Sequence, residues 1–370
     1  MNGGPGASSL MGFFTELGPI LLNKQSLPAN STASWRPFSN PYTWSQLGAL
    51  LVWEQPAGVQ SGVSVHGALP LRARAHMTRW LMADGAALDA PFSGVGFSRC
   101  LEGCPSRWND TTSAAANLAF LRAFYEAHPG ERARDLVIAG ESYGGIYVPM
   151  LAQLVLHDPA LRAAGVRLRG VAIGDGCIGF GVRGGCGLDS LDIFVSTLER
   201  LAPGVSRDAL AAVRAQCSAE ELNSGRQPGQ LSAACAAAMR SLFVEVGEYN
   251  EYHWASPCGP DGQGNWGDGS AFACATDVMP RYLALPQTQR ALGVIAGAEP
   301  PLEWTQWDGD APMYHITEAD ARPRYRDLLA HNVSMLIYSG LADTGVSNFR
   351  RTREHLRPCR PTVRAQQIRA

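Results

Sequence analysis

The stretch Leu136-Val-Ile-Ala-Gly-Glu-Ser-Tyr-Gly-Gly145 decides the fold. Its first four residues are apolar and predict a buried strand, and the glycines that follow predict a tight turn. A helix is expected next, from about Gly145 to His157. The pattern Gly-x-Ser-x-Gly between a strand and a helix is typical of a nucleophilic serine, because the glycines leave room for the serine oxygen to stand clear of the strand end. A tight turn carrying a surface serine is the plainer alternative for Ser142.

Other segments extend the same alternation of strands and helices. Apolar runs predict further strands at Leu50–Trp53, Leu168–Ile173 and Met335–Tyr338. A helix is predicted from Thr111 to His128, with Asp110 or Thr111 as its cap and Pro129 at its end. This alternation predicts an α/β fold, with a mostly parallel sheet that carries helices on both faces.

Between residues 175 and 280 the pattern changes to alanine-rich helical stretches, at Asp208–Cys217 and Ser232–Val244. This region is predicted to be a helical insertion that forms a cap. The predicted organisation is a core in two parts (1–174 and 281–349), the insertion (175–280) and an arginine-rich, disordered tail (350–370). Residues 59–94 form an atypical block with weak periodicity inside the first part of the core.

Composition narrows the function classes. Of 370 residues, 46% are hydrophobic and 17% are charged, so the chain is expected to be globular. The net charge of −2 gives no general attraction to nucleic acid, and the arginine-rich tail lacks the aromatic residues or motif of a nucleic-acid-binding arm. No apolar run reaches the roughly 18 residues needed to span a bilayer. Neither a nucleic-acid partner nor a membrane span is therefore expected.

The cysteines and the glycosylation triplets favour the secretory pathway. None of the nine cysteines has the spacing of a zinc site, so no metal is expected. Seven cysteines fall between Cys100 and Cys274, in close pairs such as Cys100/Cys104 and Cys177/Cys186, so disulfides are expected instead, with their connectivity left open. N-glycosylation acceptor triplets begin at Asn30, Asn109 and Asn332. No signal peptide follows Met1, which conflicts with this location and suggests that an N-terminal segment is missing.

Several motifs, taken in order, resemble one family. They are Asn2-Gly-Gly-Pro-Gly6, Phe13-Phe-Thr-Glu-Leu-Gly-Pro19, Asn40-Pro-Tyr-Thr-Trp44, Glu54-Gln-Pro-Ala-Gly58, Gly140-Glu-Ser-Tyr-Gly-Gly-Ile-Tyr-Val-Pro149 and Leu336-Ile-Tyr-Ser-Gly340. In this order they resemble the serine carboxypeptidases, over about Asn2 to Phe349 with residues 59–94 excepted. The resemblance implies an α/β-hydrolase fold. It also implies an exopeptidase that removes residues from peptides with a free C-terminus through an acyl-enzyme, without a cofactor.

The resemblance also assigns roles to residues. It implies that Ser142 is the nucleophile and that Asp343 orients the catalytic histidine. The N–H groups of Gly4 and Tyr143 would form the oxyanion hole. The substrate's terminal carboxylate would be held by four residues, namely Asn2, Gly3, Glu16 and Glu141. Because two neighbouring carboxylates can share a proton and donate it in a hydrogen bond, peptide binding is expected to favour acid pH.

The chain departs from the family's pattern at three places. The family's histidine is expected some fifty to sixty residues after the aspartate, where this chain carries no such motif, and His315, His331 and His355 are poor substitutes. Leu341 stands where the family usually has a second aspartate. Residues 59–94 interrupt a motif that would otherwise run from Gly58 into Val95. An unspliced intron or a gene-prediction error is our hypothesis for this block and for the tail, which sequencing the transcript would test.

Three functions remain open from sequence. The first is a serine carboxypeptidase, impaired in this chain by the missing histidine. The second is an acyltransferase on the same scaffold, which would pass the acyl group to an alcohol. The third is an inactive remnant that serves as a binding protein. For the full-length protein the predicted location is the vacuole or lysosome, or outside the cell.

Overall fold

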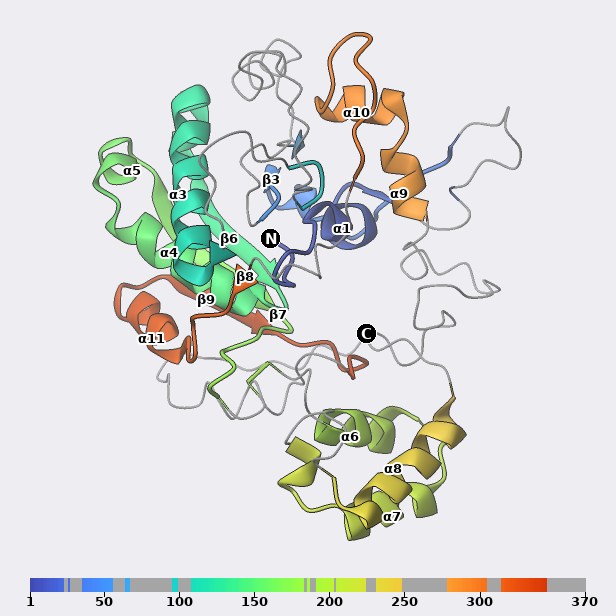
Figure 1. The fold of residues 1–370 in the computed structure, drawn as a ribbon. Helices are drawn as coiled ribbons and strands as arrows, with labels where there is room; N and C mark the ends of the chain where they lie inside the picture. The colour runs from blue at the N-terminus through green and yellow to red at the C-terminus, as the bar shows by residue number, and fades with distance from the viewer. Residues whose placement is uncertain are drawn as a thin grey trace. The chain divides into compact units, whose positions relative to one another are not determined.

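The structure is a computed structural model of the chain (Figure 1). It describes residues 1–22, 26, 35–55, 64–66, 95–98, 108–182, 185–186, 191–202, 204–223, 231–247, 278–304 and 314–344. The chain divides into two compact units. The first unit comprises Met1–Asp135, Leu154–Arg167 and Asp261–Thr317, and the second comprises Leu136–Gln153, Leu168–Pro260 and Glu318–Ala370.

A three-stranded sheet forms the centre of the second unit. Its strands are β6 (Asp135–Glu141), β7 (Arg167–Gly174) and β9 (Ser334–Tyr338), in the order β6-β7-β9. β7 and β9 are parallel, with Val171 opposite Met335. All three strands were predicted from their apolar runs and are confirmed.

Two helices of this region extend the predicted pattern. The helix α4 (Gly144–His157) begins directly after the turn at Ser142, as predicted. The helix α11 (Arg322–Ala330) precedes β9, and the hydroxyl of Tyr325 donates to the carbonyl of Gly145 at 2.7 Å. After α11 the chain turns at Asn332, which has φ = 57°. The N–H of Val333 then donates to the carbonyl of Leu328 at 3.0 Å, the bond that closes a Schellman C-cap.

In the first unit, α3 (Asp110–Ala127) is the predicted long helix, but its cap differs from the prediction. The side chain of Asn109 accepts from the N–H of Thr112 at 2.8 Å, and the Thr112 hydroxyl oxygen accepts from the N–H of Asn109 at 2.9 Å. This capping box makes Asn109 the N-cap, so the prediction of Asp110 or Thr111 was wrong. The Asp110 carboxylate instead accepts from the N–H of Thr317 at 2.5 Å and from the hydroxyl of Tyr314 at 2.9 Å.

The other α-helices and strands of the first unit are short. The helical elements are α1 (Leu10–Gly12), the π-helical turn η1 (Phe13–Leu17), α5 (Pro159–Ala163), α9 (Val278–Leu283) and α10 (Pro286–Leu292). The strands form three pairs: β1 (Ile20–Leu21) with β2 (Phe38–Ser39), β3 (Leu50–Val52) with β4 (Ser64–His66), and β5 (Trp108–Asn109) with β8 (Tyr314–His315). A shared core buries Phe13, Phe97 and Leu283. β3 confirms the predicted strand, and β4 shows that part of the 59–94 block pairs with it.

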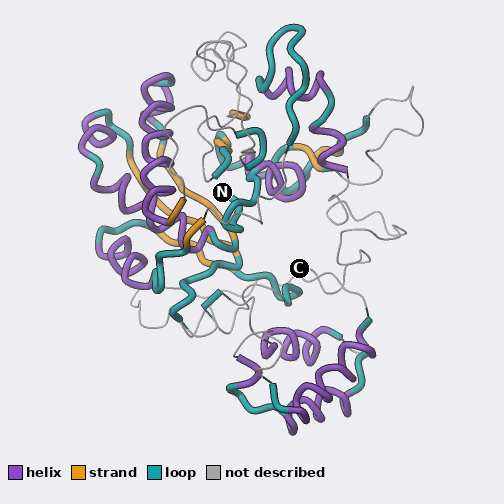
Figure 2. Tube along the Cα trace, viewed as in Figure 1, coloured by secondary structure: helices purple, strands orange, loops and turns teal. Residues whose placement is uncertain are grey.

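The helical segment of the second unit contains α6 (Leu191–Leu201), α7 (Arg207–Gln216) and α8 (Ala233–Val246), drawn in purple in Figure 2. These helices bury a common core that includes Phe194, Val213 and Leu242. A disulfide joins Cys217, after α7, to Cys235 in α8. A second disulfide joins Cys177 to Cys186, so the general expectation of disulfides is confirmed. No described helix is long and apolar enough to cross a membrane.

Several predicted features lie outside the described residues. They are Asn30, Cys100 and Cys104, most of residues 59–94, the tail 350–370 and His355.

The Cys217–Cys235 bridge gives a prediction about the helical segment. Because the bridge closes a loop with a sequence separation of 18, removing it frees the unfolded chain. We expect C217A/C235A to lower the free energy of unfolding of this segment by about 3 kcal/mol. Urea unfolding followed by far-ultraviolet circular dichroism measures the change. C177A/C186A is the control variant. A urea midpoint of C217A/C235A that does not differ from the midpoint of this control would contradict the prediction.

Candidate active site

Ser142 lies at a sharp corner between β6 and α4. Its backbone has φ = 54°, a left-handed conformation that costs a non-glycine residue of the order of 1–3 kcal/mol. Three hydrogen bonds hold the corner: Ser142 N–H donates to Gly174 O (3.0 Å), while Ser142 O accepts from Gly145 N–H (3.0 Å) and Cys177 N–H (2.8 Å). Tyr143 is buried, and Ser142 is half-buried. This strained strand-to-helix turn has the geometry of a nucleophile elbow.

The carboxyl ends of the three strands meet at one edge of the sheet. The N–H of Ser142, just after β6, reaches the last residue of β7, and the N–H of Asp175, just after β7, donates to Tyr338 O at the end of β9 (3.0 Å). The loop after β9 carries Asp343. The structure therefore brings Ser142, Asp175 and Asp343 to the same edge of one sheet.

Asp343 lies in a loop that α6 helps to hold. It is 5% exposed, and its carbonyl accepts from the hydroxyl of Thr197 at 3.4 Å. The guanidinium of Arg200 donates to the carbonyl of Leu341 at 3.4 Å. An aspartate buried at this edge is suited to hold an imidazolium, which is the role that the resemblance implies for it.

Asp175 has no role in the sequence prediction. Its carboxylate accepts from the hydroxyl of Ser339 at 2.5 Å and from the N–H of Gly340 at 2.9 Å, so it ties the turn after β7 to the loop that carries Asp343. Burial raises the pKa of Asp175 from 3.8 to about 6, and the charge of Glu141 adds to the rise, against the lowering effect of those two hydrogen bonds. Because its partners lie 164 and 165 positions away, no local pattern could have identified it.

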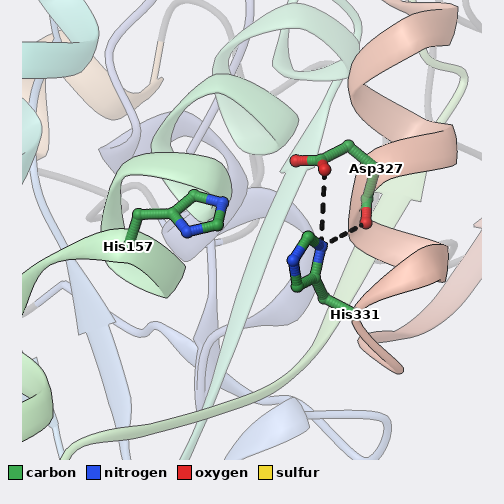
Figure 3. Close-up of side chains that lie close together, drawn as sticks. All are labelled: His157, Asp327 and His331. Atoms are coloured by element: carbon green, nitrogen blue, oxygen red, sulfur yellow. Dashed lines mark hydrogen bonds and ion pairs between the residues drawn. The ribbon is translucent and has the colours of Figure 1, made fainter.

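The histidines of this region do not complete a triad. Among the described residues of the second unit, His331 is the sole histidine. It precedes β9, whereas Asp343 follows it, and a five-residue strand is about 16 Å long. His331 Nδ1 lies 2.9 Å from the carbonyl and 3.3 Å from the carboxylate of Asp327 on α11. Dashed lines mark these two contacts in Figure 3. His315 belongs to the first unit.

The glycine-rich opening loop lies in the first unit. Gly4 has φ = 108°, and a Cβ there would lie 2.6 Å from Gly6 N, so the loop accepts only glycine at this position. The N–H of Ala7 donates to Gly3 O at 3.2 Å, which closes the bend. Glycine at position 4 leaves its own N–H unshielded by a side chain, which suits the oxyanion-donor role implied for it.

Asn2 and Glu16 come together over Gly12. Asn2 is buried, and its Oδ1 accepts from the N–H of Gly12 at 3.2 Å. A Cβ on Gly12 would lie 2.8 Å from Asn2 Oδ1 and 3.3 Å from Glu16 Oε2, so both side chains border the same small space. Asn40 Nδ2 donates to Glu16 O at 2.8 Å and holds the turn that carries Glu16. Two of the predicted carboxylate-binding residues are thus neighbours within the first unit.

The predicted site residues fall into two groups. Asn2, Gly3, Gly4 and Glu16 lie in the first unit, and Glu141, Ser142, Tyr143 and Asp343 lie in the second. Their roles in binding and catalysis stay predictions.

The raised pKa of Asp175 predicts how stability depends on pH. Between pH 3.8 and about 6 the folded protein keeps a proton that the unfolded chain has released, so the free energy of unfolding falls as pH rises through this window. The loss attributable to Asp175 is at most about 3 kcal/mol. Asparagine tolerates the positive φ of 43° at this position, so D175N should fold and lose this part of the slope.

Urea unfolding at pH 4, 5, 6 and 7 measures the slope for the wild-type chain and D175N. The exposed Asp208, at the start of α7, supplies the control variant D208N, which should keep the wild-type slope. An identical slope in D175N and wild type would show that Asp175 titrates normally in the folded protein.

Comparison with known proteins identifies the family. The serine carboxypeptidase family matches residues 1–66 and 86–364. The unmatched segment, 67–85, is shorter than the 59–94 block predicted from sequence, and the match continues beyond Phe349, where the sequence resemblance was expected to stop. The family resemblance predicted from the motifs is thereby confirmed.

Individual relatives agree with this match. A vacuolar serine-type carboxypeptidase of Saccharomyces cerevisiae is 25% identical over 360 residues, covering 93% of this chain and 57% of the relative. The lysosomal protective protein of Mus musculus is 32% identical over 176 residues, covering 48% of this chain and 27% of its own length. The chain thus spans little more than half the length of the first of these relatives, and about a quarter of the second.

A solved structure shows the same fold. The prohormone-processing carboxypeptidase KEX1 of Saccharomyces cerevisiae superposes with a TM-score of 0.52 at 16% identity, over 93% of this chain and 64% of that one. The predicted α/β-hydrolase fold is confirmed. The chain belongs to the serine carboxypeptidase family.

Proposed function

We propose that the protein of which these residues are part is a serine-type exopeptidase that releases C-terminal residues from peptides. The observation that supports this most is the strained corner at Ser142, which shares one sheet edge with the buried Asp343. A second line of support is the family, whose relatives carry the word carboxypeptidase in their names.

In the proposed reaction the Ser142 oxygen attacks the carbonyl carbon of the last peptide bond and gives its proton to a base. The N–H groups of Tyr143 and Gly4 stabilise the negative oxygen that forms. The C–N bond breaks, the base returns the proton to the leaving amine, and an acyl-enzyme remains. Water then hydrolyses this ester and regenerates the serine. Asp343 orients the base and stabilises its positive charge.

The proposed specificity for a chain end rests on four residues. The side chain of Asn2 and the N–H of Gly3 donate to the terminal carboxylate of the substrate. Glu16 and Glu141, sharing one proton, donate a further hydrogen bond. Losing that proton would place three negative charges together, so binding weakens as pH rises.

The base is the open part of this mechanism. A neutral serine is a weak nucleophile, and removing one member of a triad costs several orders of magnitude in rate. Among the described residues of the second unit the sole histidine, His331, lies at the wrong end of β9, so we expect Ser142 to react slowly. This observation also favours a second candidate, a protein that binds peptide ends without cleaving them.

The proposed location is an acidic compartment of the secretory pathway. The first relatives are named vacuolar and lysosomal, and the bridges Cys177–Cys186 and Cys217–Cys235 are typical of an oxidising environment.

Labelling with a fluorophosphonate probe tests the proposed function. A serine that has its oxyanion donors but no base should label slowly, and millimolar imidazole, supplied as an external base, should accelerate labelling at least about tenfold. Peptide mass mapping locates the label, and S142A is the control that should abolish it with and without imidazole.

The outcomes separate the candidates. Fast labelling that imidazole does not change means that a histidine of this chain already serves as the base. No labelling of Ser142 under either condition would overturn the peptidase proposal and favour the binding protein. Incubating the imidazole-assisted protein with a peptide and an acceptor alcohol then distinguishes hydrolysis from acyl transfer by the product formed.

Secretion predicts glycosylation at Asn332. Asn332 and Ser334 are exposed, and the left-handed turn at Asn332 holds the acceptor outside the core while Val333 is buried. Expressed behind a secretory leader in yeast, the protein should carry a glycan there, detected as the conversion of Asn332 to Asp by peptide N-glycosidase. S334A should remove this glycan, whereas T111A, which destroys the triplet at Asn109 and spares the helix cap, should not. Unmodified Asn332 in secreted protein would contradict the prediction.

A further inference from the structure

A buried carboxyl group lies beside the glycine-rich opening loop. Glu54, two residues after β3, is 1% exposed. One of its oxygens accepts from the hydroxyl of Ser8 at 2.6 Å, and the other accepts from the N–H of Ser9 at 2.7 Å. Ser8 and Ser9 are the residues through which the opening loop enters α1. The carboxyl group of Glu54 therefore binds the end of the loop that carries Gly4.

The next residue, Gln55, binds the beginning of the same loop. Gln55 is fully buried, and its amide nitrogen donates to the carbonyl of Asn2 at 3.2 Å. Its amide oxygen accepts from Asn117 of α3 at 2.9 Å, and Asn117 in turn accepts from the indole N–H of Trp53 at 3.0 Å. Two consecutive side chains, anchored on α3 and β3, thus hold the opening loop at both ends.

Two further segments enclose Glu54. The indole N–H of Trp304 donates to the hydroxyl oxygen of Ser8 at 3.2 Å, which fixes the hydroxyl that bonds Glu54. Gly96 lies against the carboxyl group, and a Cβ on Gly96 would lie 2.1 Å from Glu54 Oε1. Position 96 has φ = 65° as well as no room for a Cβ, and glycine is suited to both conditions. All of these residues belong to the first unit.

The surroundings determine the charge of Glu54. The groups that contact Glu54 are neutral: the hydroxyl of Ser8, the N–H groups of Ser9 and Leu10, and Gly96. Burial raises the pKa of Glu54 from 4.5 to about 7, against the lowering effect of the hydrogen bonds from Ser8, Ser9 and Leu10. The enclosure therefore holds the neutral acid best, as is expected for a desolvated carboxyl group.

We propose that Glu54 is a positioning residue for the opening loop: by holding Ser8 and Ser9 from a buried site, it keeps the loop that carries Gly4 in its bent conformation. The importance of that loop rests on the proposed function, in which Gly4 donates to the oxyanion. Opening of the loop exposes Glu54 to water, where its acidity returns to the ordinary value. By linkage, the loop is closed most firmly at acid pH and opens more often as pH rises toward 7.

Hydrogen–deuterium exchange of the peptide covering residues 1–14 tests the proposal, with rates corrected for intrinsic exchange and compared with the β7 peptide. In the wild-type protein, exchange of residues 1–14 should rise roughly a hundredfold from pH 5 to pH 8. E54Q, which keeps the shape and cannot ionise, should abolish this rise. E54A removes both acceptors and should increase exchange about tenfold or more at pH 5, with β7 unchanged.

Asp110 supplies the matched control. It is a fully buried carboxylate of the same unit, and it accepts from one N–H and two hydroxyl groups of residues 314–317. D110A should therefore increase exchange at 314–317 and leave residues 1–14 at the wild-type rate. If E54A leaves residues 1–14 protected, or if E54Q keeps the wild-type rise with pH, the proposal is wrong. Should E54A fail to fold, the comparison of E54Q with wild type decides alone.

The exchange measurement is independent of the proposed function, because it needs no reaction at Ser142. If the wild-type protein never labels with fluorophosphonate but the exchange results are as expected, the proposed peptidase function is wrong and the role of Glu54 stands. Wild-type protein that labels with imidazole, together with E54A that labels at an equal rate, would show that Glu54 does not position the oxyanion donor.

Discussion

The meeting of three strand ends at one edge is the constraint on which the second unit depends. Two backbone hydrogen bonds, from Ser142 to Gly174 and from Asp175 to Tyr338, tie the turns after β6, β7 and β9 together. Parallel strands place their carboxyl ends side by side, so residues far apart in sequence become neighbours there. The strain at Ser142 persists because α4 on one side and the turn at Cys177 on the other hold the corner in place.

Buried carboxyl groups are the second recurring feature. Glu54 and Asp175 each accept hydrogen bonds from a hydroxyl group and a backbone N–H, and each lies next to a loop that the proposed mechanism uses. Burial raises the pKa of both, because a charge without water around it is costly. Each of these two groups therefore contributes more to the stability of the folded state at acid pH than at neutral pH.

Local patterns predicted the elements, and long-range contacts decided the rest. The strands and α4 were predictable because apolar runs and the glycine turn act within a few residues. The cap of α3 was misassigned because three polar residues compete at its start, and Asp110 is engaged by residues more than two hundred positions away. Glu54 was visible within a motif, but its role depends on Ser8, Gly96 and Trp304, which only the fold brings together. The same holds for Asp175.

The geometry of the sheet edge also limits how the proposed active site can be completed. A base must reach the Ser142 oxygen and accept orientation from Asp343, and both lie beyond the carboxyl ends of their strands. A histidine before a strand, such as His331, is excluded by the length of that strand. A histidine on a segment that follows Asp343, or one brought over the edge by another segment, meets the requirement. Asp343 is buried, and its loop is held by contacts with Thr197, Arg200 and Asp175. The position of Asp343 therefore does not depend on the presence of the base. In the proposed mechanism, the placement of an imidazole is therefore the one requirement that the described residues of this edge leave to another segment.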